Sequence, residues 1–533
     1  LGSYSNTMGA VTVTNGGRIT NGTLSGSSYA SGAVGQTNTI SANLTGSGGL
    51  TLSGDTNTTV LSGSNSYSGE TSLNGNTNMR LRVNSTNALS SNSSLLGSSS
   101  ATRTPTLELA AAGDYKMQNF KGGNMIFLAT NGAATLSFTN TSATNEMTAG
   151  DKSFYATNVD VTFAGALDVS ATTENKQFRF FGDGDYTFGG SILTTNNTFT
   201  SSLVAGTTGT VTLNASNNYN GTTTVNSNAT LLLGNDYALG TTNSGTTVLS
   251  GGALDLGGRS VSGETLVIEG TGVSSGGAMK NSSASAASFS GAFTLTAATT
   301  IATTNGNITL SGAIGQDAGS RNLTKTGAST LTLSGTSANT YLGRTTVSGG
   351  VLELNKTPGV DAIAGAVTVG SGAKLLLSAN NQVADTSAIT LSGGTIQRAS
   401  GVSEVFGDLD LTAASFLNFG TGDTGTLSFG TYTPSALLTI NNFLPGNTLT
   451  FGSDLTSTIN DTSFFSFSGD FTSSYSGSTF TITAIPEPST YVAAVGLLGL
   501  MLWPSRRRLL KDAKSILGLR APTRDRLQAQ GKA

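Results

Sequence analysis

The sequence predicts an all-β protein, a right-handed parallel β-helix with about 22 residues per coil. Short runs in which Leu or Val alternates with Thr or Ser, such as residues 330–333 and 351–354, are typical of half-buried strands. Gly, Asn and Ser bound these runs, and Gly supplies 71 of the 533 residues, which suits a chain with many tight corners. Helical periodicity over ten or more residues is absent before the C-terminal segment.

A near-constant spacing between the runs favours stacked coils. Steps of 21, 23 and 21 residues, then of 22 and 22, separate the members of two series: Leu331, Leu352, Leu375 and Ile396, and Val347, Val369 and Leu391. Earlier steps of 20, 21 and 23 residues join Leu213 to Leu233, Leu233 to Leu254, and Val225 to Val248. A β-sandwich is the alternative, but it has no reason to keep a constant two-strand period. We therefore expect these residues to point inward, to pair in parallel and to form a core without aromatic side chains.

Composition excludes several kinds of chemistry. The chain contains no Cys and no His, so disulfides, thiolate or imidazole catalysis and His-ligated metals are impossible in it. Nine of the 26 basic residues lie from Arg506 onward with two acids, which leaves 17 basic and 27 acidic residues in 1–505. A mildly acidic body without basic patches argues against nucleic-acid binding. We expect neither a cofactor nor a metal.

A longer motif occurs three times, with Tyr, Gly and Thr at every second position. Its members are Tyr67, Gly69 and Thr71, then Tyr219, Gly221 and Thr223, then Tyr341, Gly343 and Thr345. The stretches around them, near 48–89, 209–240 and 323–365, resemble the autotransporter-associated β-strand repeat of secreted bacterial β-helices. The first copy departs from the pattern, because Arg80 and Arg82 bracket Leu81. The resemblance implies fold and export rather than a reaction, and each Tyr is interpreted as a corner or stacking residue, with a ligand contact as the alternative.

The C-terminal segment contains Pro486-Glu487-Pro488, an apolar run at 491–503, and Arg506, Arg507 and Arg508. In this order, these features resemble a PEP-CTERM sorting signal. The resemblance implies an exosortase-type membrane protease as a partner, cleavage near the Pro-Glu-Pro triplet and transient contact of 491–503 with the inner membrane. Thirteen helical residues cover about 20 Å, less than the ~30 Å of hydrocarbon, so a short C-terminal hydrophobic helix would cross only marginally. The arginines suit the cytoplasmic side.

These patterns divide the chain into four parts. Residues 1–436 are assigned to the solenoid, 437–484 to a Phe-rich segment that caps its open end, 485–508 to the sorting signal and 509–533 to a basic cytoplasmic tail. The sequence begins Leu1-Gly2-Ser3 without a signal peptide, so we interpret this end as mature or as a fragment.

The sequence favours an exported, non-enzymatic structural or adhesive protein of the cell surface or extracellular matrix. Rows of Ser, Thr and Asn would contact extracellular polysaccharide through many weak interactions. The alternative is a β-helical polysaccharide lyase or hydrolase that uses Asp183 with Asp185, or Asp408 with Asp410. Asp183-Gly184-Asp185 could also offer oxygen ligands to Ca²⁺, but the motif does not recur.

Overall fold

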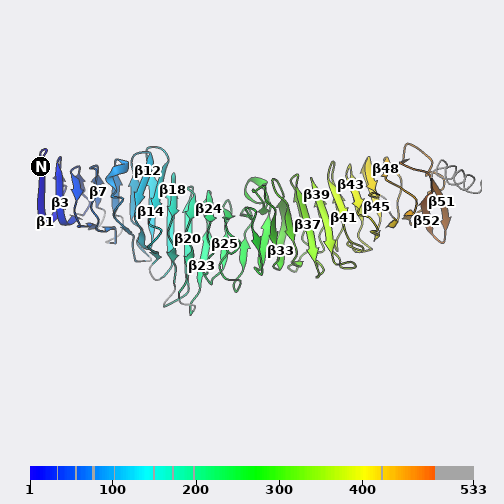
Figure 1. The fold of residues 1–533 in the computed structure, drawn as a ribbon, viewed down its shortest axis with the longest axis horizontal. Helices are drawn as coiled ribbons and strands as arrows, with labels where there is room; N and C mark the ends of the chain where they lie inside the picture. The colour runs from blue at the N-terminus through cyan, green and yellow to red at the C-terminus, as the bar shows by residue number, and fades with distance from the viewer. Residues whose placement is uncertain are drawn as a thin grey trace, which may run out of the picture.

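Stacked β-coils form one elongated rod (Figure 1). The computed structural model describes residues 1–32, 34–54, 57–74, 79–100, 102–147, 150–170, 173–195, 198–421 and 424–486. Within these ranges the helices are two single 3₁₀ turns, η1 (Thr86–Ala88) and η2 (Val273–Ser275). The all-β parallel solenoid that the sequence predicts is confirmed.

Parallel ladders of strands run along the rod. One ten-stranded ladder extends from β1 (Ser5–Thr14) to β22 (Ile192–Leu193), and another from β29 (Ser260–Val261) to β50 (Phe465–Phe467). Between them, β33 (Phe293–Ala302) pairs with β30 (Leu266–Gly270) through its first half and with β31 (Met279–Lys280) through its second. A single long strand thus pairs with two shorter strands of the preceding coil.

The predicted register is confirmed in the best-matched coils. Leu331, Leu352, Leu375 and Ile396 are paired in sequence on β37 (Thr330–Gly335), β39 (Val351–Lys356), β41 (Lys374–Leu377) and β43 (Thr395–Arg398). Val347, Val369 and Leu391 are paired likewise on β38 (Thr345–Val347), β40 (Val367–Val369) and β42 (Ile389–Ser392). All seven side chains are fully buried. Each coil therefore stacks an apolar residue on its counterpart in the next.

One earlier pairing was predicted wrongly. Leu213 pairs with Leu233, and Val225 with Val248, as the spacing indicates. Leu254 on β28 (Ala253–Asp255), however, pairs with Leu231 rather than Leu233 on β26 (Thr230–Leu233). Leu231 and Leu233 of β26 both point inward, and a shift of two residues keeps a strand on the same face. The spacing of apolar residues in the sequence therefore does not decide whether Leu254 pairs with Leu231 or with Leu233.

The core of the coils between residues 120 and 188 is aromatic, which corrects the expectation of a core without aromatic side chains. The ring centroids of Phe154 and Phe180 are 5.5 Å apart, and those of Phe163 and Phe188 are 5.2 Å apart, both in stacked geometry. Because identical side chains on adjacent rungs lie one strand spacing apart, Phe forms columns here in the same way that Leu does elsewhere.

Parallel stacking continues across the predicted boundary at 436. β48 (Leu438–Asn441) pairs in parallel with β46 (Ser415–Asn418) and β50. The described chain then ends in antiparallel pairs of β49 (Asn447–Phe451), β52 (Thr479–Ala484) and β51 (Phe471–Ser476). Among the described residues, no helix is long and apolar enough to cross a membrane. The hydrophobic helix predicted at 491–503 and the tail at 509–533 lie outside them.

Candidate functional site: the repeated turn motif

The three motif tyrosines lie inside the solenoid, and each makes the same hydrogen bond. The hydroxyls of Tyr67, Tyr219 and Tyr341 lie 2.7, 2.6 and 2.7 Å from the Oγ1 atoms of Thr71, Thr223 and Thr345, respectively. All six residues are fully buried, and burial raises the pKa of Tyr67 to about 12. Each Thr begins a strand: β8 (Thr71–Ser72), β25 (Thr223–Val225) or β38. The motif therefore fixes the turn that precedes this strand, and its Tyr is unavailable to a ligand.

The motif glycines allow two coils to approach closely. A Cβ on Gly343 would lie 2.0 Å from the carbonyl oxygen of Arg321 in the preceding coil. On Gly69 and Gly221 it would lie 2.3 Å from the Gly49 nitrogen and 2.5 Å from the Ser201 carbonyl carbon. Backbone cannot move aside as a flexible side chain can, so only Gly fits at the centre of the motif.

An Asn two residues before each Tyr connects three successive coils, a role that the sequence alone did not reveal. Asn339 accepts a 2.9 Å hydrogen bond from the Ile314 amide of the preceding coil and donates a 2.8 Å bond to the Ala362 carbonyl of the following coil. The equivalent residues Asn65 and Asn217 make the same two kinds of bond. In the sequence, the signal of this role is the Asn that occurs two residues before the Tyr in all three copies. The backbone groups to which each Asn bonds lie 21–25 residues away in the chain.

The departure in the first copy has a structural explanation. Arg80 and Arg82 on β9 (Arg80–Val83) lie 3.3 and 3.6 Å from the carboxylate of Glu108 on the adjacent β11 (Thr106–Leu109). Glu108 is nearly buried and also accepts a hydrogen bond from Thr130 Oγ1. Two cations from one coil thus balance an acid on the next.

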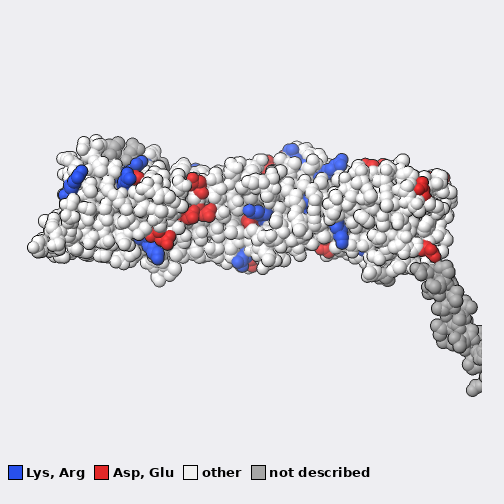
Figure 2. Space-filling view, turned by 90° about the horizontal axis from the view of Figure 1, so that it is seen from above, with Lys and Arg blue, Asp and Glu red and all other residues white. Residues whose placement is uncertain are grey.

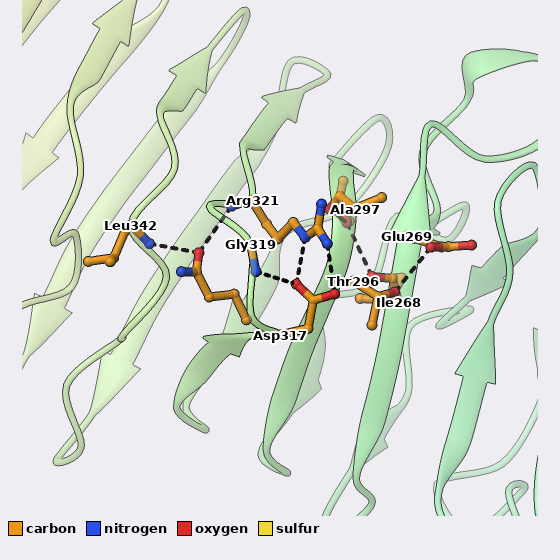
Figure 3. Close-up of polar contacts among 10 residues, drawn as sticks. Ile268, Glu269, Thr296, Ala297, Asp317, Gly319, Arg321 and Leu342 are labelled. Atoms are coloured by element: carbon orange, nitrogen blue, oxygen red, sulfur yellow. Dashed lines mark hydrogen bonds and ion pairs between the residues drawn. The ribbon is translucent and has the colours of Figure 1, made fainter.

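Polar side chains also fix the surface turn of the third copy. Gln316 Oε1 accepts bonds from the amides of Arg321 and Leu342, at 3.0 and 2.9 Å. The Arg321 guanidinium points at Asp317, with its Nε 2.6 Å from Oδ1 (Figure 3). This contact lowers the pKa of Asp317. Leu342, between the Tyr and the Gly of the motif, is 61% exposed.

The four candidate catalytic carboxylates are exposed, and three of them accept hydrogen bonds from backbone amides of other coils. Asp183 and Asp185 are exposed, and each accepts a 2.6 Å bond from a backbone amide of a neighbouring coil, Asn158 and Thr210 respectively. Asp408 accepts a 2.7 Å bond from the Thr431 amide, and its hydrogen bonds to Thr431 lower its pKa. Asp410 is exposed on β45 (Leu409–Ala413). In the part of the chain that the structure describes, no three acidic residues gather in a way that could hold a metal ion.

A surface concavity of about 580 Å³ is lined by residues between 335 and 402, and none of these four aspartates is among them. Thr336, Asn355, Lys356 and Asn380 contribute to its lining, which contains no Asp or Glu. Paired carboxylates for glycan cleavage are therefore absent from this concavity.

The sorting-signal residues fall almost entirely outside the described chain. Pro486 is described, whereas Glu487, Pro488, Arg506, Arg507 and Arg508 are not.

Comparison with known proteins identifies the repeats. Residues 56–75, 203–233 and 323–354 match the passenger-associated-transport-repeat family, and each match contains one Tyr-Gly-Thr motif. Searches of curated proteins and of solved structures found no significant match. The fold and the repeats together define a parallel β-solenoid that carries passenger-associated repeats, and they fit an exported protein of the passenger type.

Proposed function

We propose that this protein is an exported rod of the cell surface or extracellular matrix with a structural or adhesive role and no catalytic activity. The observation that carries the proposal is the repeat itself, which matches the passenger-associated family in three places. The residues that recur in all three copies fix the turn or the contact between coils. A motif devoted to the turn and to the contact between coils supports a scaffold rather than a reaction.

Polysaccharide is the proposed partner. Thr346, Thr368 and Thr390 are register partners on successive strands and lie partly exposed, about 4.8 Å apart along the rod. Such rows offer hydroxyls at a regular spacing, so contacts that are weak singly act together. Charged side chains are sparse and scattered over the face drawn in Figure 2, which suits a neutral rather than a polyanionic partner.

The proposed route to the surface is a PEP-CTERM signal read by an exosortase-type protease, with residues 491–503 held in the inner membrane during processing. The order of the Pro-Glu-Pro triplet, the apolar run and the arginines supports it.

Replacement of Pro486-Glu487-Pro488 by three alanines tests this route in a host that contains an exosortase. We expect the parent to be shortened and released from the inner membrane, and the triple variant to remain full-length and membrane-held on immunoblots of cell fractions. Pro358→Ala, at an exposed proline in the solenoid, is the matched control and should be processed like the parent. Processing of the triple variant at the parent's rate would refute the sorting step.

A further inference from the structure

One part of the outer surface departs from the Ser and Thr composition of the rest. β17 (Lys152–Thr157) and β20 (Lys176–Gly182) are parallel neighbours, and Tyr155 is the register partner of Phe181. Their neighbours Phe154 and Phe180 point into the core and are fully buried, so Tyr155 and Phe181 point outward. Tyr155 is 42% exposed. An aromatic pair on the solvent face of this solenoid is not needed for its core.

The two rings form an overlapping stack. Their centroids are 5.2 Å apart and their planes differ by 26°. Gly206 lies in the next coil, and a Cβ on it would be 2.4 Å from the Phe181 ring. The Phe181 ring therefore packs directly against Gly206, and it covers one face of Tyr155. The two stacked rings form an apolar platform that the sheet itself holds in place.

Fixed polar groups adjoin the platform. Arg179 lies two residues before Phe181 on the same face of β20, about 7 Å along the strand. Its guanidinium donates a 2.6 Å bond to Asp151 Oδ2, and its Nε donates a 2.9 Å bond to Gln177 Oε1. With Asn175, Thr200 and Ser202, these three residues line a concavity of about 310 Å³.

We propose that this surface, defined by Tyr155, Phe181, Arg179, Asp151 and Gln177, is a binding site for a neutral pyranose polysaccharide. A pyranose ring has an apolar C–H face, which packs on an aromatic ring, and a rim of hydroxyls, which bond to fixed donors and acceptors. The Asp151 carboxylate balances the Arg179 charge, and Lys176, which also lines the concavity, is nearly fully buried and donates to the backbone carbonyls of Met147 and Ser170. The exposed groups of the site therefore carry no excess positive charge to attract an anionic chain. This inference rests on the proposed adhesive function and gives it a specific site.

Affinity electrophoresis of the full chain tests the site. Native gels contain hydroxyethyl cellulose, galactomannan or dextran, and a gel without polysaccharide gives the reference mobility. We expect at least one polysaccharide to retard the parent, and Tyr155→Ala to reduce the relative affinity at least tenfold. Arg179→Ala should weaken retardation as well. Tyr237→Ala removes a tyrosine that is 66% exposed elsewhere, and it should match the parent.

Each alternative result overturns the site. Equal retardation of the parent and Tyr155→Ala would show that polysaccharide binds elsewhere on the rod, and the adhesive function would survive. Equal loss in Tyr155→Ala and Tyr237→Ala would show a general effect of surface aromatics. If none of the three gels retards the parent, the site is rejected. Export and sorting are tested separately by the processing experiment. Far-ultraviolet circular dichroism confirms that each variant keeps its β structure.

Discussion

The hydroxyl of Tyr341 lies 2.7 Å from Thr345 Oγ1, and both residues are fully buried. The same pair recurs at Tyr67 with Thr71 and at Tyr219 with Thr223. In all three copies the intervening Gly lies against the backbone of the preceding coil. In each copy, the repeat therefore fixes where the following strand begins relative to the preceding coil.

Removing one hydroxyl from the pair should destabilise the protein. Tyr341→Phe keeps the ring but leaves a buried Thr hydroxyl without this partner, and we expect a loss of about 1–2 kcal/mol in the free energy of unfolding. Thr345→Val should cost a similar amount, and the double variant less than the sum. Urea unfolding of the four proteins measures this coupling, and strictly additive losses would contradict it.

Gly343→Ala should be strongly destabilising. The new Cβ would collide with the Arg321 carbonyl, so the two coils must separate, at a cost on the order of 3 kcal/mol. Gly349→Ala is the matched control, because its Cβ would meet nothing closer than 3.5 Å. Thermal unfolding should show a large fall in melting temperature for the first variant and little change for the second. Equal melting temperatures would disprove close packing at the motif.

Stability should depend on pH through Glu404, which begins β44 (Glu404–Val405). Burial raises the pKa of this carboxyl from 4.5 to about 7, although the amides of Gln382 and Val383 donate to it; nearby Asp385 and Asp361 raise it further. The folded protein thus retains a proton that the unfolded chain releases. Its stabilising contribution is complete below pH 4.5 and is lost as the pH rises to about 7.

Glu404→Gln isolates this effect. The parent should lose up to about 3 kcal/mol between pH 4.5 and 7 from this group, and the variant should lack that part of the slope. The chain contains no His, so no imidazole titrates in the same window. Urea unfolding of the parent and the variant at each pH measures the difference between the two slopes. Identical slopes for the parent and Glu404→Gln would reject the assignment.

A charge inside one coil should disrupt its neighbours first. Leu352→Asp places a carboxylate between Leu331 and Leu375, with an expected cost on the order of 4 kcal/mol. Because solenoid stability depends on adjacent coils, hydrogen exchange should accelerate first in β37 and β41. Asn355→Asp, exposed on the same strand, should leave exchange unchanged. Uniform acceleration along the whole rod would contradict nearest-neighbour stacking.

The sequence predicts the fold well, because period-2 alternation and a period near 22 residues report directly on stacked strands. The register was correct at Leu352 and Leu375, each of which is the first of two inward leucines on its strand. It was wrong at Leu254, which was matched by spacing to Leu233, the second inward leucine of β26, whereas its partner is the first, Leu231.

The contacts of the motif were less predictable, since they depend on other coils. The sequence shows Tyr341, Gly343 and Thr345 at a fixed spacing, but the bonds of Asn339 to coils on both sides require the three-dimensional stack. Similarly, Arg80 and Arg82 look anomalous until Glu108 is seen on the adjacent strand.

Surface labelling tests the central claim, that this solenoid is an exported rod, most directly. The chain has no Cys, so a single introduced thiol is the only target for a maleimide. Leu342→Cys lies at a position that is 61% exposed, and Leu352→Cys at a fully buried one. With a membrane-impermeant maleimide on intact native cells, we expect Leu342→Cys to be labelled and Leu352→Cys to remain unlabelled. Labelling of Leu342→Cys only after cell lysis would contradict export.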